Sequence, residues 1–336
     1  MSVLGTQALT LSDYKKRINP DGTTAFIIEA LEKVNPITQD ARWKEGNLPT
    51  GNVTTIRTSL PTPSIRKINR GIKRSKSTTK QVQDTCIILE DRSSVDIELL
   101  ALQKDKEGFR RSEDAAFVQG FADVVAANMF YGSTDDNPDT FNGLSVRYNT
   151  LTDGGNGTAG HQVISAGTAG TDTNTSIYIV GWGTQATCGI YPKNSAMGLQ
   201  HRDLGEKTVT DSEGREYQAL QSLFTWKAGL AVQNIRANAL VRNIDVTKLK
   251  TAANKQAIIE AIVQAKNRIQ GLDRGDKQMA MYVSPSIYDM LELWLMDKNN
   301  VHITRQEMMG QMPQLFFTGL PVKKCEAISE QEPAIT

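Results

Sequence analysis

Apolar and polar positions near the start of the chain predict an arm rather than a folded domain. Ile27, Leu31 and Val34 recur at helical spacing, and this stripe ends ahead of Pro36. The rest of the first fifty residues is mainly polar and offers little apolar area for a core. We therefore expect residues 1–50 to lie on another element or on another chain.

Over residues 52–90, β-branched residues alternate with polar residues on both sides of a central basic stretch. This spacing predicts a long β-hairpin, with Val53–Ile56 and Thr85–Leu89 in its two legs and a turn near Gly71. A two-stranded ribbon on its own is marginally stable in water. The predicted hairpin therefore needs a neighbour to lie against.

The segment 112–131 has the clearest helical pattern in the chain. Phe117 and Phe121 belong to an apolar face, Ser112 is a suitable N-cap, and Gly132 is a suitable stop. A helix of this length would form a rod of roughly 30 Å.

The composition shifts to Gly, Thr, Asn and Asp over 133–175, which predicts mainly loop. Strand patterns with turns at 211–214 and 227–229 follow. The predicted strands are Ile177–Val180, Ala186–Tyr191, Glu216–Trp226 and Leu230–Arg242.

After Ile244 the pattern alternates between helices and strands and predicts a small α/β unit. Its predicted elements are a helix at 254–270, a strand at Met279–Val283, a helix opened by Ser284 and Pro285, and a closing strand at Phe316–Cys325. Together the segments predict a protein of the α+β class.

Charge changes this picture in one place. The chain of 336 residues has 38 Lys+Arg and 37 Asp+Glu, a net charge of +1, yet residues 46–83 contain no acid. The eight basic residues of this stretch are Arg57, Arg66, Lys67, Arg70, Lys73, Arg74, Lys76 and Lys80. Because charges are rarely buried without partners, the stretch must face something acidic outside its own fold. Acids elsewhere in the chain suggest complementary patches on copies of one molecule.

Two kinds of partner, nucleic acid or another protein, could bind this basic stretch. A ribbon that binds nucleic acid would carry its basic residues on one face with aromatic residues between them. No aromatic residue occurs between Trp43 and Phe109, and Arg66 and Lys67 fall on alternate faces. A net charge near zero also argues against coating DNA by counterion release. Protein neighbours are favoured, and nucleic-acid binding through 57–80 stays the alternative.

The sequence has no recognisable motif for catalysis or for metal binding. No phosphate-binding loop, nucleophile elbow, zinc-protease motif or dinucleotide fingerprint occurs. His161, His201 and His302 lie in polar contexts, and the three cysteines are far apart, which fits a reducing compartment. We expect no enzyme activity, no catalytic, cofactor-binding or metal-binding residues, and no membrane partner, since no apolar run of about 18 residues occurs.

The order of these parts resembles the major capsid protein of tailed bacteriophages, which has the Hong Kong 97-type fold. The resemblance covers nearly the whole chain, and its specific stretches look like the compact capsid proteins of some short-tailed phages. The most specific stretches are Glu45–Gly51, Ser75–Val82, Phe141–Tyr148 and Gly189–Lys193.

The resemblance implies a set of domains. They are an N-terminal arm (1–50), an extended β-hairpin loop (51–90), a peripheral domain (91–244) with a spine helix at 112–131, an axial domain (245–326) and a C-terminal tail (327–336). Many relatives place peripheral strands after the axial domain, whereas here those strands would come from 176–242.

The resemblance also implies a function. The chain would assemble as hexamers and pentamers into the icosahedral phage head around double-stranded DNA, with the eight basic residues of the hairpin between subunits. Its partners would be itself, a separate scaffold, a portal and cement or decoration proteins, with only weak non-specific DNA contact. It would be made into virions in the host bacterial cytoplasm. A compartment shell of the encapsulin type, which shares the fold, stays an alternative.

Overall fold

The structure is a computed structural model. It describes residues 33, 35–102, 105–155, 157–167, 169–170, 172–211, 213–249, 251–271, 277–295, 303–306 and 314–335. The helical stripe of Ile27, Leu31 and Val34 lies outside these residues.

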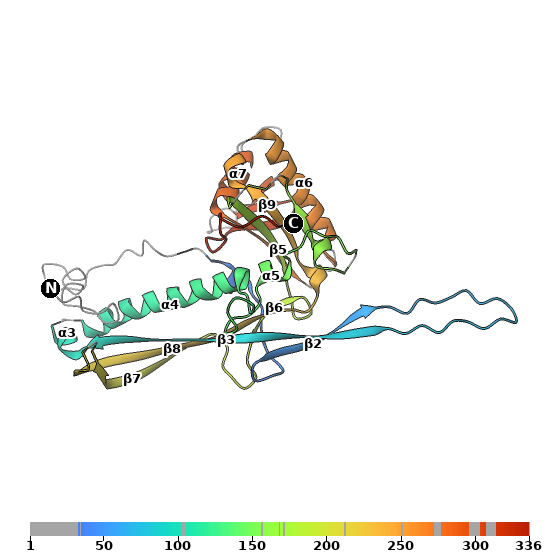
Figure 1. Ribbon diagram of the computed structural model, residues 1–336. Coiled ribbons are helices and arrows are strands. Elements are labelled where there is room, and N and C mark those ends of the chain that lie inside the picture. Colours follow the sequence, from blue (N-terminus) through green and yellow to red (C-terminus); the bar gives the residue numbers. More distant parts are fainter. Residues whose placement is uncertain are drawn as a thin grey trace.

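Three parts are visible in Figure 1: a long limb, a projecting hairpin and a body of mixed helices and strands. The helices are α2 (Ile37–Asp40), α3 (Ile97–Ala101), α4 (Lys106–Tyr131), α5 (Leu144–Arg147), α6 (Ala252–Arg268) and α7 (Pro285–Leu295). Short 3-10 turns are η1 (Gly160–Gln162), η2 (Ile235–Ala237) and η3 (Val246–Lys248).

The described strands join into one sheet that runs from the body into the limb and the hairpin. They are β1 (Trp43–Glu45), β2 (Gly51–Ser59), β3 (Thr78–Asp96), β4 (Val163–Ser165), β5 (Asn174–Trp182), β6 (Thr187–Tyr191), β7 (Leu199–Thr210), β8 (Glu216–Val232), β9 (Ala239–Asp245), β10 (Gln278–Val283), β11 (Ile303–Gln306), β12 (Gln314–Phe317) and β13 (Leu320–Lys324).

The body has a core between its sheet and helices α6 and α7. Ile262 of α6 and Leu291 of α7 pack in the same buried cluster as Ile179 of β5 and Val241 of β9. The compact unit therefore draws on residues before 245 as well as after it. The domain limits expected from the sequence stay predictions.

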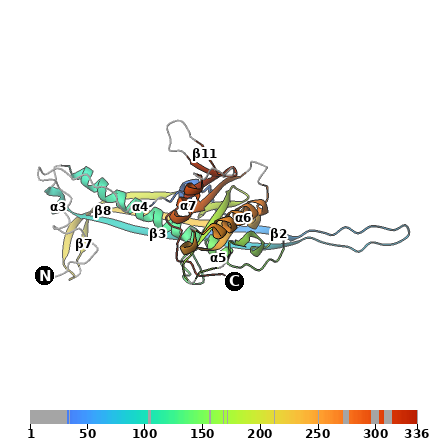
Figure 2. The same cartoon turned by 90° about the horizontal axis from the view of Figure 1, so that it is seen from above.

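The limb places α4 beside β3, β7 and β8 (Figures 1 and 2). Phe117 and Phe121 of α4 meet Phe224 of β8, with ring centroids 5.7 and 6.4 Å apart. Near the end of α4, Phe130 is buried against Tyr178 of β5, so the helix also joins the limb to the body.

Strand β3 is shared between the hairpin and the limb. Its first part pairs antiparallel with β2, with Val53 opposite Gln83 and Ile56 opposite Lys80. Its second part, from Cys86 to Asp96, pairs with β8. The hairpin was therefore predicted correctly, but the pairing of its legs was not, because the return leg begins earlier than Thr85.

The start of α4 corrects the sequence prediction. The helix begins at Lys106, and the N-cap is Asp105, whose Oδ1 accepts a hydrogen bond from the Gly108 backbone N–H at 2.9 Å. The sequence offered Ser112 as a suitable N-cap, but Ser112 lies inside the helix. The predicted end is correct, because Gly132 follows the last helical residue.

Among the strands after α5, β5, β6 and the turn near 211–214 are as predicted, whereas the turn at 227–229 is not. Strand β8 runs unbroken through that point because β3 and β6 both pair with it there. The predicted strand Leu230–Arg242 is interrupted by η2. Strand β7 was not predicted, since its residues are mostly polar and exposed.

In the C-terminal part, α6, β10 and α7 agree with the prediction. The predicted closing strand is instead a hairpin of β12 and β13, with Thr318 and Gly319 at positive φ between them. In the part of the chain that the structure describes, Ser284 Oγ has no hydrogen-bond partner, so this side chain does not cap α7. Glu330 Oε1 accepts a hydrogen bond from the Ser286 N–H at 3.1 Å and takes that role.

Candidate interaction surface

The hairpin formed by β2, β3 and the residues between them projects away from the rest of the chain (Figure 1). Every residue from 57 to 81 is exposed. Strand pairing ends at Ser59 and Thr78. At the tip, the Arg70 N–H donates to the Lys67 carbonyl at 3.2 Å, and Asn69 has a φ of 62°. The residue with the left-handed backbone in this turn is therefore Asn69. The sequence suggests Gly71 instead.

The eight basic residues singled out in the sequence all lie on this exposed ribbon. Within the described part of the chain, no ion pair involves any of them. The structure thus gathers them on one projection and leaves their charges available to a neighbour.

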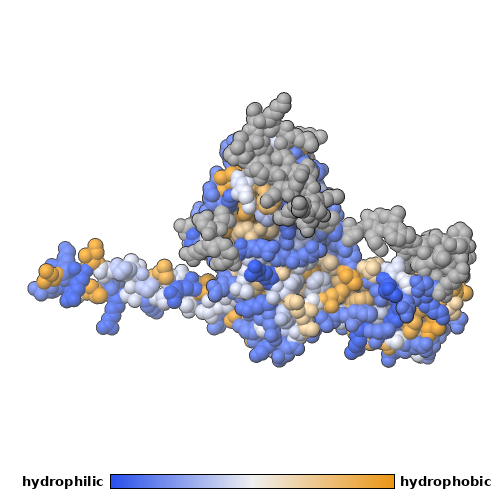
Figure 3. Space-filling view, turned by 180° about the vertical axis from the view of Figure 1, so that it is seen from behind, coloured by the Kyte–Doolittle hydropathy of each residue, from blue (hydrophilic) through white to orange (hydrophobic). Residues whose placement is uncertain are grey.

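The hairpin also carries exposed apolar side chains that sequence reasoning missed. Leu60, Ile65, Ile68 and Ile72 are all exposed, and Ile65 and Ile68 keep 96% and 92% of their accessible surface. Figure 3 shows hydrophobic residues scattered among hydrophilic ones along the projection. The available signal was three isoleucines in a segment too polar and too basic for a core.

The base of the hairpin is built by the stretch Glu45–Gly51. The Asn47 side chain bonds both backbone polar groups of Val53, accepting from its N–H at 2.7 Å and donating to its carbonyl at 2.8 Å. The Leu48 and Gly51 backbones bond to each other. These contacts turn the chain sharply into β2 and fix the direction in which the hairpin leaves.

A buried ion pair fastens the hairpin base to α5. Arg147 Nη2 lies 2.7 Å from Asp84 Oδ1, and Arg147 also donates to the carbonyls of Asn142 and Leu230. The other carboxylate oxygen of Asp84 is buried and has no hydrogen-bond partner among the described residues. Burial raises the pKa of Asp84, and the Arg147 charge offsets only part of that rise. Asp84 therefore depends on Arg147, because removing Arg147 leaves the buried carboxylate without its partner.

The stretch Gly189–Lys193 meets the same base from β6. Strand β1 pairs with β6, and a Cβ on Gly189 would lie 2.7 Å from the Trp43 ring. The Gly46 N–H donates to the Tyr191 carbonyl at 2.8 Å. Three of the four sequence stretches that carry the family resemblance thus converge on the hairpin base, and the fourth, Ser75–Val82, belongs to its return leg.

The histidines and cysteines considered in the sequence as catalytic or metal-binding candidates do not form a site in the described part of the chain. His161 Nδ1 lies 3.0 Å from Asp153, His201 packs on Phe224, and His302 lies outside the described residues. Burial raises the pKa of Cys86 to about 12 and that of Cys188 to about 11. No group of three or more potential metal ligands occurs among the described residues. Their helices also include none that is long and apolar enough to cross a membrane.

Comparisons with known proteins agree with this architecture. The family model of the major capsid protein GP7 matches residues 19–336. The capsid structure of bacteriophage Epsilon15 is similar over 100% of this chain and 99% of its own, with 28% sequence identity and a TM-score of 0.77. The capsid of bacteriophage JBD30 shares the fold, with a TM-score of 0.53 and 14% identity over 90% of this chain and 95% of its own. No curated protein matches.

The match to the family model covers almost the whole chain, and the family is one of structural capsid proteins. It favours the phage capsid over the encapsulin-type compartment. Self-association into a shell and a place in the virion follow from that family. The chain belongs to the GP7 major capsid protein family: it is a major capsid protein of a tailed bacteriophage, with the Hong Kong 97-type fold.

Proposed function

We propose that the hairpin of residues 51–90 is a clasp between adjacent subunits of the capsid. The observation that carries this proposal is the full exposure of residues 57–81 together with eight basic side chains that pair with no acid in the described chain. A ribbon of this kind gains little from its own fold and is marginal alone. Contact with a neighbouring copy would bury its isoleucines and supply acids for its charges.

The clasp would join copies into hexamers and pentamers of an icosahedral head around double-stranded DNA. Contacts that differ on the two sides of a subunit close into rings, and opposite charges on one molecule suit such contacts. Many modest contacts per subunit make a stable particle while each contact alone stays reversible. A net charge of +1 supports only weak, non-specific contact with the DNA inside.

The domain assignment belongs to this proposal. Residues 1–50 would be the arm, 91–244 the peripheral domain, 245–326 the axial domain and 327–336 the tail. A separate scaffold, a portal and cement or decoration proteins would be further partners, with assembly in the cytoplasm of the host bacterium. The resemblance to compact phage capsid proteins supports these assignments.

The clasp can be tested by removing charge from the hairpin tip. We expect the variant with Arg66, Lys67, Arg70 and Lys73 all changed to Ser to fold normally, since these residues are all exposed. Its assembly into capsids should be severely reduced, as measured by sedimentation and electron microscopy. The matched control exchanges Lys and Arg at the same four positions and keeps every charge, so it should assemble.

Normal particles of normal stability from the serine variant would refute the clasp. The nucleic-acid alternative predicts a different result. If the ribbon bound DNA, the unassembled wild-type chain would bind it with a steep dependence on salt, and the serine variant would lose that binding while still forming particles.

A further inference from the structure

The C-terminal segment of residues 327–335 buries one acidic side chain. Among residues 329–335, which are all described, Glu332 alone is buried, with 3% of its surface exposed, and its neighbours Gln331 and Pro333 are exposed. Burial of a carboxylate is costly unless the surrounding groups are arranged to receive it. The contacts of Glu332 therefore indicate what this segment does.

The carboxylate of Glu332 lies among hydroxyl groups and one guanidinium. The Tyr131 hydroxyl donates to its Oε1 at 2.5 Å, the Ser176 hydroxyl donates to its Oε2, and Arg242 Nη2 lies 3.6 Å from Oε2. The Tyr178 hydroxyl lies 3.4 Å from Oε1. Burial raises the pKa of Tyr131, so its hydroxyl keeps the proton that it donates. This set of donors suits an ionised carboxylate.

Two asparagine side chains of the body hold the backbone of the same segment. Asn243 of β9 accepts from the Ile335 N–H at 3.0 Å and donates to the Ile335 carbonyl at 2.9 Å. Asn174 of β5 donates from its side chain to the Glu332 carbonyl at 3.1 Å, and its own carbonyl accepts from the Glu332 N–H at 2.8 Å. Backbone pairing together with a pocket for one side chain is a common way to bind an extended peptide.

The segment also holds α4 at two places, about two turns apart. At the first, Asn35 donates to Asp123 Oδ1 at 2.7 Å and accepts from the Ala327 N–H at 2.9 Å. At the second, the Tyr131 hydroxyl accepts from the Ser329 N–H at 2.9 Å. Asp123 and Tyr131 belong to α4, which runs along the limb (Figure 1). The segment therefore links the helix of the limb to the sheet of the body.

The groups that receive the segment have other supports. Arg242 Nη1 donates to the Ser145 hydroxyl of α5 at 2.8 Å. The Asn174 side chain bonds both backbone polar groups of Gly170, at 2.7 and 2.8 Å. The segment, in contrast, enters with one buried carboxylate between exposed neighbours. A receiving site with its own supports and a ligand with one buried anchor can separate while the body stays folded.

We propose that the body has a binding site for an acidic extended peptide, that residues 327–335 of the same chain fill it, and that this bound segment is a brace which fixes the angle between limb and body. Packing of Phe130 against Tyr178 holds only the end of α4, whereas the brace also holds the helix at Asp123. The proposal does not depend on the hairpin clasp. Because every copy in a closed shell repeats the same subunit geometry, the angle bears on particle size.

Two spin labels on the unassembled chain measure this angle. Ala115→Cys on α4 and Gln264→Cys on α6 are exposed positions for the labels, and the chain with only its native cysteines is the labelling control. We expect one narrow distribution of label distances. Glu332→Ala should lose it and give a broad distribution, because the segment no longer has its anchor. A distribution as narrow as that of the unchanged segment would overturn the proposal.

A peptide added in trans tests the binding site itself. A peptide with the sequence of residues 327–336 should bind the Glu332→Ala chain and restore the narrow distribution. The same peptide with Glu332→Gln should bind about tenfold more weakly or worse, the scale of losing a hydrogen bond to a charged group. A wild-type peptide that neither binds nor narrows the distribution at millimolar concentration would refute the binding site.

Two variants of the same segment are matched controls. Glu330→Gln removes the same charge outside the site and keeps the oxygen that accepts from the Ser286 N–H. Gln331→Ala shortens an exposed neighbour of Glu332. Both should keep the narrow distribution. Broadening by either control equal to that of Glu332→Ala would show that the site of Glu332 is not the cause, and this would overturn the proposal.

Asn35→Ala tests the brace without leaving Arg242 buried alone, so it serves also where Glu332→Ala fails to fold. It removes the tie at Asp123 and should broaden the distribution too; an unchanged one would contradict the brace. Particles assembled from either variant should show several diameters by electron microscopy where the wild-type chain gives one. A single wild-type diameter would refute the role of the brace in particle size.

Discussion

Glycine residues allow the chain segments at the hairpin base to approach each other closely. A Cβ on Gly51 would lie 1.9 Å from the Asp84 carbonyl oxygen, and one on Gly46 would lie 2.3 Å from the Gly51 oxygen. A Cβ on Gly229 would lie 2.5 Å from the Thr85 oxygen. Backbone atoms cannot turn aside as flexible side chains do, so the base has its present form only with glycine at these positions.

Gly51→Ala should therefore destabilise the chain. The added methyl group forces β2 away from β3 at the point where the hairpin leaves the fold, at a cost of roughly 1–3 kcal/mol. Chemical denaturation of the unassembled chain measures this cost. Hydrogen exchange along β2 should rise together with it.

Gly71→Ala is the matched control. A Cβ at Gly71 meets nothing within 4 Å, so the free energy of unfolding should stay within about 0.5 kcal/mol of the wild type. Equal destabilisation by the two changes would contradict the packing account of the base.

The same residues show where local sequence signals mislead. From the sequence, Gly229 predicts a turn, but it lies inside β8 and allows the close approach of Thr85. Gly71 also predicts a turn, whereas Asn69 has the left-handed φ. A glycine in a sequence can mark either an unusual backbone conformation or a close approach between two chain segments. Only the tertiary structure shows which of the two applies.

At the scale of elements, the N-terminus of α4 decides how far the limb extends. Asp105 caps α4 by accepting a hydrogen bond from the Gly108 N–H. The helix therefore begins at Lys106, ahead of Ser112. Leu99, Leu100 and Phe109 pack with Val95 in a small cluster at this end. The cap and this cluster together hold the helix start against the strands of the limb.

Asp105→Ala should cost about 1 kcal/mol of stability, because it leaves backbone N–H groups of the first turn without a side-chain acceptor. Ser112→Ala should be neutral or slightly stabilising, since alanine is the better residue inside a helix. Urea denaturation of both variants gives the comparison. A loss of stability in Ser112→Ala with none in Asp105→Ala would place the start of α4 at Ser112, as the sequence alone predicts.

Most elements were predictable from the sequence because their apolar pattern reflects burial. Helices α6 and α7 bury one apolar face, whereas β5, β6 and most of β10 are buried along their length and appear in the sequence as short apolar runs. Strand β7 escaped prediction because it is an exposed edge strand that pairs only with β8 among the described strands. The break at η2 escaped because Ile235 and Ala237 continue an apolar pattern without continuing the strand.

At the scale of the molecule, one strand runs from the projecting hairpin into the limb. β3 pairs with β2 in the hairpin and with β8 in the limb. The buried pair of Asp84 and Arg147 lies where the strand changes partners. The angle between hairpin and limb is therefore set by the folded subunit before any copy meets another.

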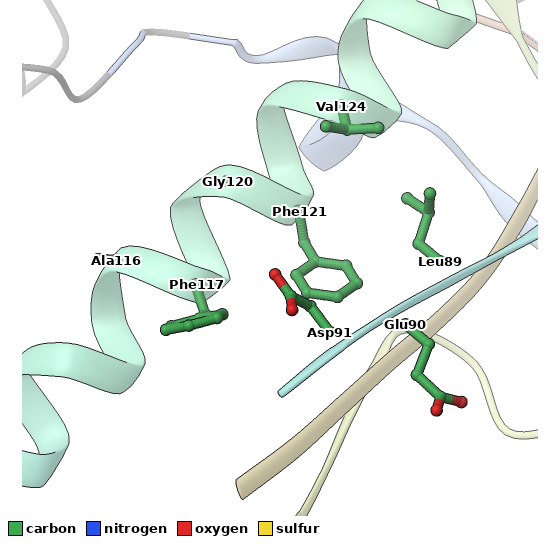
Figure 4. A pocket seen from close by; sticks show the side chains of 8 residues that line it. All are labelled: Leu89, Glu90, Asp91, Ala116, Phe117, Gly120, Phe121 and Val124. Atoms are coloured by element: carbon green, nitrogen blue, oxygen red, sulfur yellow. The ribbon is translucent and has the colours of Figure 1, made fainter. Parts of the chain in front are cut away.

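The fold was recognisable from sequence because the stretches typical of the family are those that build the hairpin base. The eight basic residues were also visible in the sequence. The apolar groove that Leu89, Phe117 and Phe121 line between α4 and β3 (Figure 4) was not visible, because its walls come from two segments whose apolar residues look like ordinary core. Only the arrangement of α4 over β3 leaves Val124 exposed beside the buried Phe121.

Removal of the hairpin tests the central claim most directly. Residues 60–77 can be replaced by an Asn-Gly turn that joins Ser59 to Thr78, the last paired residues of β2 and β3. The free energy of unfolding should be unchanged or slightly higher, because the replaced residues are all exposed and a shorter loop costs less entropy.

The assembly of this shortened chain is then measured by sedimentation velocity and electron microscopy, at concentrations where the wild-type chain is fully assembled. We predict a folded variant that stays as unassembled subunits. Capsids of normal size and stability from the shortened chain would contradict the claim that copies of this protein hold one another through the hairpin.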